Sequence, residues 1–140
     1  MIVLDTNVLS ELMRPKPFAQ VVAWVALQPA AELFTTAITE AEIFYGIELL
    51  AKSKRRDSLL AAAEKMFTED FAGRILGFES EAARHFAAIA ARRRALGRPI
   101  SQADGQIAAT TRSHGARLAT GNAPDFADCN IVVIDPWVCT

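Results

Sequence analysis

The first ten residues limit the fold of this chain more than any other stretch. Ile2, Val3 and Leu4 form an apolar run that is too short to span a membrane but has the length of a strand buried on both faces. Asp5 follows at once, so we expect it at the carboxyl end of that strand, where open α/β sheets bind their ligands. Asp5 is therefore the first candidate for chemistry. The alternative is that Asp5 only caps a short helix over residues 8–13.

Short apolar runs alternate with amphipathic segments along the rest of the chain. Strands are predicted at residues 33–36, 74–78, 117–120 and 131–134, and helices at residues 18–28, 39–50, 59–67, 80–94 and 101–114. No linker or internal repeat interrupts this order. The pattern predicts an α/β fold in a single domain over residues 1–140, with a central five-stranded parallel sheet covered by helices on both faces.

Composition and charge narrow the classes of protein to which the chain can belong. The 140 residues carry 15 basic and 16 acidic side chains, a formal net charge of -1, so any site for a polyanion must come from local clustering. Cys129 and Cys139 have neither metal-ligand spacing nor nearby histidines, which predicts free thiols in a reducing compartment. No segment has the roughly 18 apolar residues of a membrane span. We therefore predict a cytoplasmic protein with no membrane partner.

Acidic and amide side chains recur at the ends of the predicted elements. Asp5 ends the first strand, Glu42 and Asp104 lie near the starts of helices, and Asn122 and Asp125 follow the fourth strand. Acids gathered at one edge would repel one another unless a cation held them, and oxygen ligands suit Mg²⁺ or Mn²⁺. Such ions activate water and stabilise the charge that develops on a phosphodiester, so the cluster predicts metal-dependent phosphodiester hydrolysis.

Helix capping is the competing interpretation for two of these acids. Thr39 with Glu42, and Ser101 with Asp104, each have the three-residue spacing of a capping box. In that role each acid would stabilise a helix N-terminus by about 0.5–1 kcal/mol and would need no further function. The spacing alone leaves both interpretations open.

The order of motifs resembles that of PIN-domain proteins, specifically the ribonuclease toxins of the VapC and FitB type. The matching segments are residues 2–11, 37–47, 101–110, 118–126 and 134–137, which together span nearly the whole chain. The resemblance implies a PIN-like α/β/α sandwich with endoribonuclease activity. It also implies a homodimer, a small antitoxin that binds DNA on behalf of the pair, and an RNA substrate.

By this resemblance Asp5, Glu42 and Asp104 are the metal-binding, catalytic acids. The family often has a further acid or amide after the fourth strand, where this chain has Asn122, with Asp125 three residues later. Thr6 and Thr120 match hydroxyl positions that orient the acids or a metal-bound water. The alternative for both threonines is a hydrogen bond to local backbone.

Two basic clusters are candidates for contact with RNA or with an acidic partner segment. By the resemblance, the position of Gly121 usually holds Arg in the family, so this chain lacks one possible contact to an RNA phosphate there. The denser cluster consists of Arg92, Arg93, Arg94 and Arg98, and the second of Lys52, Lys54, Arg55 and Arg56. The alternative is that both clusters are solvated helix ends.

These observations lead to one principal functional prediction and two alternatives. The principal prediction is a Mg²⁺- or Mn²⁺-dependent endoribonuclease that acts as the toxin of a toxin–antitoxin pair. A phosphatase with Asp5 as nucleophile is less well supported, since its usual second acid is replaced by Asn7. The other alternative is a catalytically weak domain that acts mainly in a partner-bound, DNA-binding repressor complex.

Overall fold

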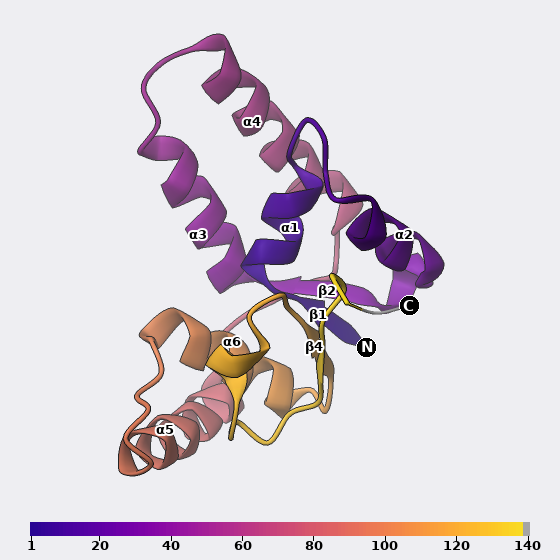
Figure 1. Ribbon diagram of the computed structural model, residues 1–140. Coiled ribbons are helices and arrows are strands. Elements are labelled where there is room, and N and C mark those ends of the chain that lie inside the picture. The colour runs from indigo at the N-terminus through magenta and orange to yellow at the C-terminus, as the bar shows by residue number, and fades with distance from the viewer. Residues whose placement is uncertain (139–140) are drawn as a thin grey trace.

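A five-stranded parallel sheet forms the centre of the molecule (Figure 1). This computed structural model describes residues 1–138. The strands are β1 (Ile2–Leu4), β2 (Leu33–Thr36), β3 (Ile75–Leu76), β4 (Arg117–Ala119) and β5 (Val133–Ile134), in the spatial order β3-β2-β1-β4-β5. All four pairings are parallel, so the carboxyl ends of the strands meet at one edge. The predicted α/β class and five-stranded parallel sheet are confirmed.

Helices cover both faces of the sheet (Figure 1). One layer contains α1 (Thr6–Leu12), α2 (Ala19–Leu27), α3 (Ala37–Glu48) and α4 (Lys54–Lys65), and the other contains α5 (Ser80–Ala95) and α6 (Gln102–Ser113). Short helical turns lie at Ala30–Glu32, Met66–Asp70 and Ala123–Phe126. No helix among residues 1–138 is long and apolar enough to cross a membrane.

The alternation of side chains along β1 divides the core between the two layers. Ile2 and Leu4 pack in the cluster that includes residues of α1 to α4, whereas Val3 packs with residues of α5 and α6. All three side chains are buried, as expected for the central strand of a sheet with helices on both faces. Asp5 is thereby held at the carboxyl edge of the sheet.

The start of α3 differs from the prediction. Thr36, at the end of β2, is the N-cap, and its hydroxyl accepts a hydrogen bond from the Thr39 backbone N–H at 3.1 Å. Thr39 therefore lies inside the helix, and Glu42 lies in its second turn, too far along to bond the first amides. The capping-box interpretation of Glu42 is wrong, because the helix begins as soon as the strand ends.

The starts of α4 and α6 bear on the basic cluster and on Asp104. The helix predicted over residues 59–67 begins earlier in the structure, because Ser53 caps α4 and Arg55 and Arg56 lie in its first turn. Ser101 caps α6 as predicted. Gly105 lets α6 approach α5 closely, since a Cβ at this position would lie 2.8 Å from the ring of Phe86.

Candidate active site

The carboxylate of Asp5 lies at the carboxyl edge of the sheet and is almost completely buried, with 4% of the residue exposed. Its backbone N–H donates to the carbonyl of Ala119 on β4 at 3.0 Å. Its Oδ2 atom accepts a hydrogen bond from the Thr120 hydroxyl at 2.8 Å. Both contacts fix Asp5 to the neighbouring strand rather than to the helix that follows it. The Asp5 side chain makes no capping hydrogen bond to α1.

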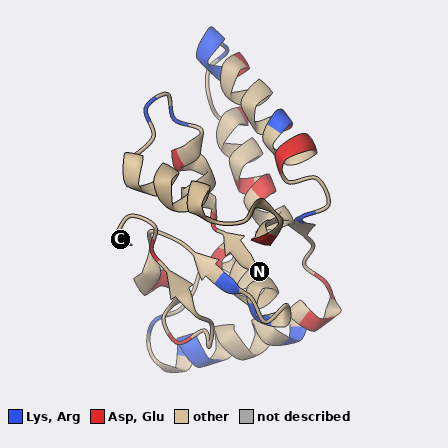
Figure 2. Ribbon diagram, turned by 90° about the vertical axis from the view of Figure 1, so that its right-hand side faces the viewer, with Lys and Arg blue, Asp and Glu red and all other residues tan. Residues whose placement is uncertain are grey.

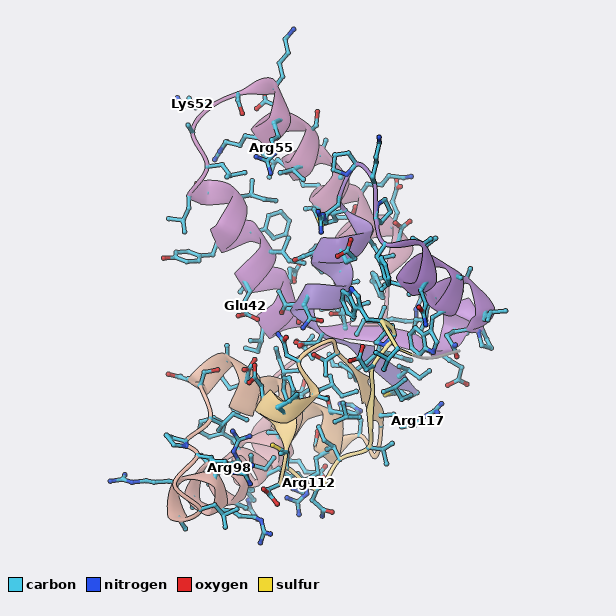
Figure 3. All side chains as sticks on the ribbon, viewed as in Figure 1. Glu42, Lys52, Arg55, Arg98, Arg112 and Arg117 are labelled. Atoms are coloured by element: carbon cyan, nitrogen blue, oxygen red, sulfur yellow. The ribbon has the colours of Figure 1, made fainter. Side chains whose placement is uncertain are left out.

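Glu42 reaches the same edge from the second turn of α3 (Figure 3). The hydroxyl of Thr6 donates to Glu42 Oε1 at 2.6 Å and lies 3.1 Å from the hydroxyl of Thr39. Thr6 immediately follows Asp5, so this contact links the end of β1 to α3. The hydroxyls of Thr6 and Thr120 therefore each contact one of the acids rather than only local backbone.

Asp104 reaches the edge from the first turn of α6. Because α6 leads into the parallel strand β4, it runs back along the sheet and begins at the carboxyl edge. The Ser101 hydroxyl accepts a hydrogen bond from the Asp104 backbone N–H at 3.2 Å, so a cap is present as the spacing predicts. The Asp104 carboxylate nevertheless lines a cleft together with those of Asp5 and Glu42. Capping and a place in the site are thus compatible for this residue.

Burial and mutual repulsion raise the pKa values of two of the acids. The pKa of Asp5 is raised to about 6, first by burial and then by the charges of Asp104 and Glu42, against the lowering effect of the Thr120 hydrogen bond. The pKa of Asp104 is raised mainly by burial, with smaller contributions from Asp125 and Glu42. Raised carboxyl pKa values in a cleft are typical of functional sites and indicate where a bound cation would be stabilising.

Asn7 holds the loop after β4 against the end of β1. Its Nδ2 donates to the Thr120 hydroxyl at 3.1 Å, and its Oδ1 accepts from the Gly121 backbone N–H at 3.2 Å. The Asn122 backbone N–H also donates to the Thr120 hydroxyl at 3.1 Å. We predicted no site role for Asn7, although its place two residues after Asp5 puts it at the same edge. Both ends of its amide are engaged, and an amide is not an acid, which counts against the phosphatase alternative.

The residues predicted to complete the acid set differ in position. The side chain of Asn122 lines the cleft, whereas Asp125 lies on the helical turn Ala123–Phe126 and is not among the lining side chains. The charge of Asp125 is still close enough to raise the pKa of Asp104. Asn122 is thus in reach of a ligand in the cleft, whereas Asp125 affects the site only through its charge on Asp104.

Gly121 allows an aromatic ring of the cleft lining to pack closely against the backbone. A Cβ at Gly121 would lie 2.8 Å from two ring carbons of Trp137, closer than van der Waals contact allows. Trp137 is half-buried, packs against the core cluster that includes Ile2 and Leu4, and lines the cleft. The space that a side chain at position 121 would need is therefore occupied by the ring of Trp137.

Arg93 of the denser basic cluster is not available to RNA or to a partner, which corrects its prediction as a contact residue. Its guanidinium is buried, donating from Nη1 to the carbonyls of Asp125 (2.7 Å) and Ala127 (3.1 Å) and from Nε to that of Arg98 (2.7 Å). This side chain thus fastens the loop after β4 to the end of α5.

The rest of that cluster lies away from the acids. Arg92 and Arg98 pair with Asp128, Arg94 is exposed, and none of the four lines the acid cleft. Figure 3 shows Arg98 beside α5, whereas Glu42 lies at the end of α3 next to the sheet. In Figure 2 basic residues gather at the tip of the α3–α4 hairpin and, at the opposite end of the molecule, along α5.

Two other arginines do line the acid cleft. Arg14, in the loop after α1, and Arg55, in the first turn of α4, are both lining residues. Arg55 belongs to the second predicted basic cluster, whereas Arg14 was not predicted. The sequence around Arg14 gives little indication of a site role, because a single arginine before a proline is common in loops.

The acids fit a hydrated Mg²⁺ or Mn²⁺ ion better than a metal held only by protein. Among residues 1–138, no three Asp, Glu, His or Cys side chains are grouped closely enough to enclose an ion. Mg²⁺ is usually held by one or two carboxylates, with waters and substrate phosphates completing its octahedron. Asp5, Glu42 and Asp104, facing one open cleft with the amide of Asn122, supply that kind of oxygen set.

Comparison with known proteins supplies a family and three close matches. The PIN domain family profile matches residues 2–129. The chain is 39% identical to the VapC ribonuclease Y4jK of Sinorhizobium fredii, over 98% of each chain, and 39% identical to the toxin FitB of Neisseria gonorrhoeae, over 98% of this chain and 99% of FitB. A structure of FitAB bound to an IR36 DNA fragment superposes with a TM-score of 0.92 at 38% identity, covering 100% of this chain and 98% of that one.

Proposed function

The chain belongs to the PIN-domain family, and from this membership and the geometry of the acid cleft we propose that it is a Mg²⁺- or Mn²⁺-dependent endoribonuclease. It hydrolyses RNA phosphodiester bonds and acts in the cytoplasm as the toxin of a toxin–antitoxin pair. The observation that carries this proposal is the meeting of Asp5, Glu42 and Asp104, from three separate elements, in one cleft at the carboxyl edge of the sheet. The relatives named as ribonucleases support the same activity.

The metal would be held by Asp5, Glu42 and Asp104, directly by one or two of them and otherwise through its waters, with the amide of Asn122 as a neutral oxygen donor beside them. When bound, it supplies a water of lowered pKa and neutralises charge that develops on the phosphate. The protein's own contribution is to fix the carboxylates before the substrate arrives. The Thr120 hydroxyl holds Asp5 Oδ2 at 2.8 Å and the Thr6 hydroxyl holds Glu42 Oε1 at 2.6 Å, so one oxygen of each acid is anchored.

Burial of Asp5 adds to this preorganisation. A carboxylate that is almost completely buried and close to two other acids is unfavourable as an anion in the free protein. A divalent cation relieves that repulsion. The unfavourable charge of the acids in the free protein therefore increases the affinity of the site for a metal. The ring of Trp137 adds an apolar side chain to the lining of the cleft.

A small antitoxin is the proposed protein partner. The solved relatives include FitAB bound to DNA and a DNA-bound VapBC from Salmonella typhimurium, in which the toxin is part of a DNA-bound complex. We extend this to the present chain as a homodimer that contacts DNA only through its antitoxin. The alternative, a catalytically weak domain that acts mainly in such a repressor complex, is favoured only by the amide of Asn122 in place of an acid.

A cleavage assay on total cellular RNA tests the proposal. The purified protein, freed of any partner, is incubated with RNA in Mg²⁺, in Mn²⁺ and in EDTA, and the cut ends are mapped. Cleavage in both metals and none in EDTA is expected. Folded protein that binds the metal but cuts no RNA would instead favour the repressor complex.

A further inference from the structure

We propose that Arg14 and Arg55 form a phosphate-binding site for single-stranded RNA, at the point where the acid cleft opens into an apolar groove. This inference rests on the proposed ribonuclease function and names the path of its substrate. Neither the acid set nor the basic cluster on α5 supplies such a path.

The acid cleft and the apolar groove are continuous. The groove lies between α1, α3 and α4, and both hollows share the side chains of Thr6, Ser10, Arg14, Glu42 and Arg55. An extended chain that runs from the acid cleft into the apolar groove therefore passes Arg14 and Arg55, which line both hollows. Figure 3 shows Arg55 on α4, on the same side of the sheet as Glu42.

Both arginines have unused hydrogen-bonding capacity. Arg14 is held at one nitrogen only, with Nη1 3.3 Å from Glu11 Oε1, and its side chain is 66% exposed. The other oxygen of Glu11 accepts from the Phe18 backbone N–H at 3.0 Å, so Glu11 contacts one guanidinium nitrogen of Arg14 and leaves the other donors of the guanidinium free for a ligand. Arg55 is exposed and makes no ion pair with any residue from 1 to 138, whereas the neighbouring Arg56 pairs with Glu48 at 3.4 Å.

Charge complementarity identifies the occupant. The acids at the edge of the sheet repel a polyanion, so a substrate must gain its affinity from cations next to them. The planar guanidinium fork matches two phosphate oxygens at once. Arg92 and Arg98 are a poorer choice for this role, since Asp128 already pairs with both.

The groove beyond the arginines suits the bases of a single strand. It is lined by aliphatic side chains, among them Ile43 and Ile47 of α3, Leu50 just after α3, and Leu59 of α4. A duplex keeps the faces of its bases stacked inside the helix, whereas a single strand can turn its bases onto an apolar surface. An acidic peptide would satisfy the arginines but not use the adjoining acids, which is why RNA is the occupant argued here.

Binding of a short single-stranded oligoribonucleotide, followed by fluorescence anisotropy in EDTA, tests the site without cleavage. Arg14→Gln and Arg55→Gln are each expected to weaken affinity about five- to tenfold. Each should also lower the slope of log affinity against log salt by about 0.7. Lys54→Gln is the matched control, because Lys54 is the exposed neighbour of Arg55 and lines neither hollow. Thermal unfolding of each variant checks that the fold is retained.

The outcomes separate this inference from the proposed function. If the wild type cuts RNA and both glutamine variants bind and cut RNA as the wild type does, the phosphate site is refuted and the ribonuclease proposal stands. If the arginines control RNA binding but no metal supports cleavage, the site stands and the ribonuclease proposal fails. If the variants lose affinity for a polyglutamate peptide and not for RNA, the surface is a protein-docking site, and the inference is overturned.

Discussion

The Thr120 hydroxyl donates a 2.8 Å hydrogen bond to Asp5 Oδ2, joining residues 115 positions apart in the sequence. The Thr120 hydroxyl oxygen also accepts hydrogen bonds from Asn7 Nδ2 and from the Asn122 backbone N–H. Thr120 is thus the point at which the loop after β4 is fastened to the acid that follows β1. The site depends on this pairing of β1 with β4 as much as on the acids themselves.

Replacing Thr120 by valine tests this connection. Thr120→Val keeps the shape of the side chain but leaves the buried Asp5 carboxylate without its donor, so we expect the free energy of unfolding to fall by about 1–3 kcal/mol. Thr110→Val is the control, because Thr110 is also buried but its hydroxyl only bonds the Gln106 carbonyl within its own helix. Urea unfolding measures both. Equal decreases in the free energy of unfolding of the two variants would show that the hydrogen bond from Thr120 to Asp5 adds no stability beyond that of an ordinary threonine hydrogen bond.

The raised pKa of Asp5 predicts that stability falls as the pH rises. The folded-state pKa is about 6 and the ordinary value 3.8, so between them the folded protein binds more protons than the unfolded chain. In EDTA the charged carboxylate therefore destabilises the fold above pH 6, by on the order of 3 kcal/mol, and protonation relieves this by about pH 4.

Asp5→Asn removes that charge while its amide oxygen still accepts from Thr120. We expect the variant to melt at a higher temperature than the wild type at neutral pH in EDTA, and at a similar temperature near pH 4. Mg²⁺ should raise the melting temperature of the wild type only. A variant less stable than the wild type at neutral pH would contradict the assigned destabilisation.

The contact between Gly121 and Trp137 predicts opposite effects of alanine at two glycines. Gly121→Ala places a Cβ 2.8 Å from the indole and should destabilise the fold by about 1–3 kcal/mol as the ring is displaced. Gly46→Ala should stabilise α3 by roughly 0.5–1 kcal/mol, because no atom lies within 4 Å of its new Cβ. Tryptophan fluorescence should report the displacement in the first variant, and an unchanged spectrum with unchanged stability would count against it.

Burial of Arg93 predicts that it differs sharply from its neighbour Arg94. Arg93→Gln leaves the carbonyls of Asp125, Ala127 and Arg98 without their donor, and we expect a loss of about 3 kcal/mol. Arg94→Gln, at an exposed position, should change stability by less than about 0.5 kcal/mol. Chemical denaturation of the two variants measures these losses. Similar stabilities would show that Arg93 is as exposed as Arg94 and is available as a contact residue.

Local patterns in the sequence were sufficient to predict the sheet and the place of Asp5. A buried strand followed directly by an acid is a pattern of only five residues. It can be recognised without knowing how the strands are ordered in the sheet. The N-cap of α3 was predicted three residues late, because Thr36 and Thr39 are both good caps and only the end of β2 selects between them. Of the two interpretations that the sequence left open for Glu42, the observed start of α3 excludes capping, and Glu42 lines the cleft.

The parts of the site that were missed depend on contacts between distant segments. Asn7 bonds residues 113 and 114 positions away, which no spacing along the chain reveals. Arg93 stands in a run of three arginines that looks solvated, and only the return of the loop after β4 buries it. Arg14 enters the cleft because the loop after α1 folds back beside α4.

The most direct test of the central claim is the rate of RNA cleavage in Mg²⁺ by the wild type, Asp104→Asn and Asp57→Asn. Asp57 is the matched control, because it is an exposed acid in the first turn of a helix but does not line the cleft. We predict that Asp104→Asn lowers the rate about 100-fold or more while Asp57→Asn leaves it unchanged. Wild-type cleavage that persists in Asp104→Asn, or that needs no metal, would contradict the account.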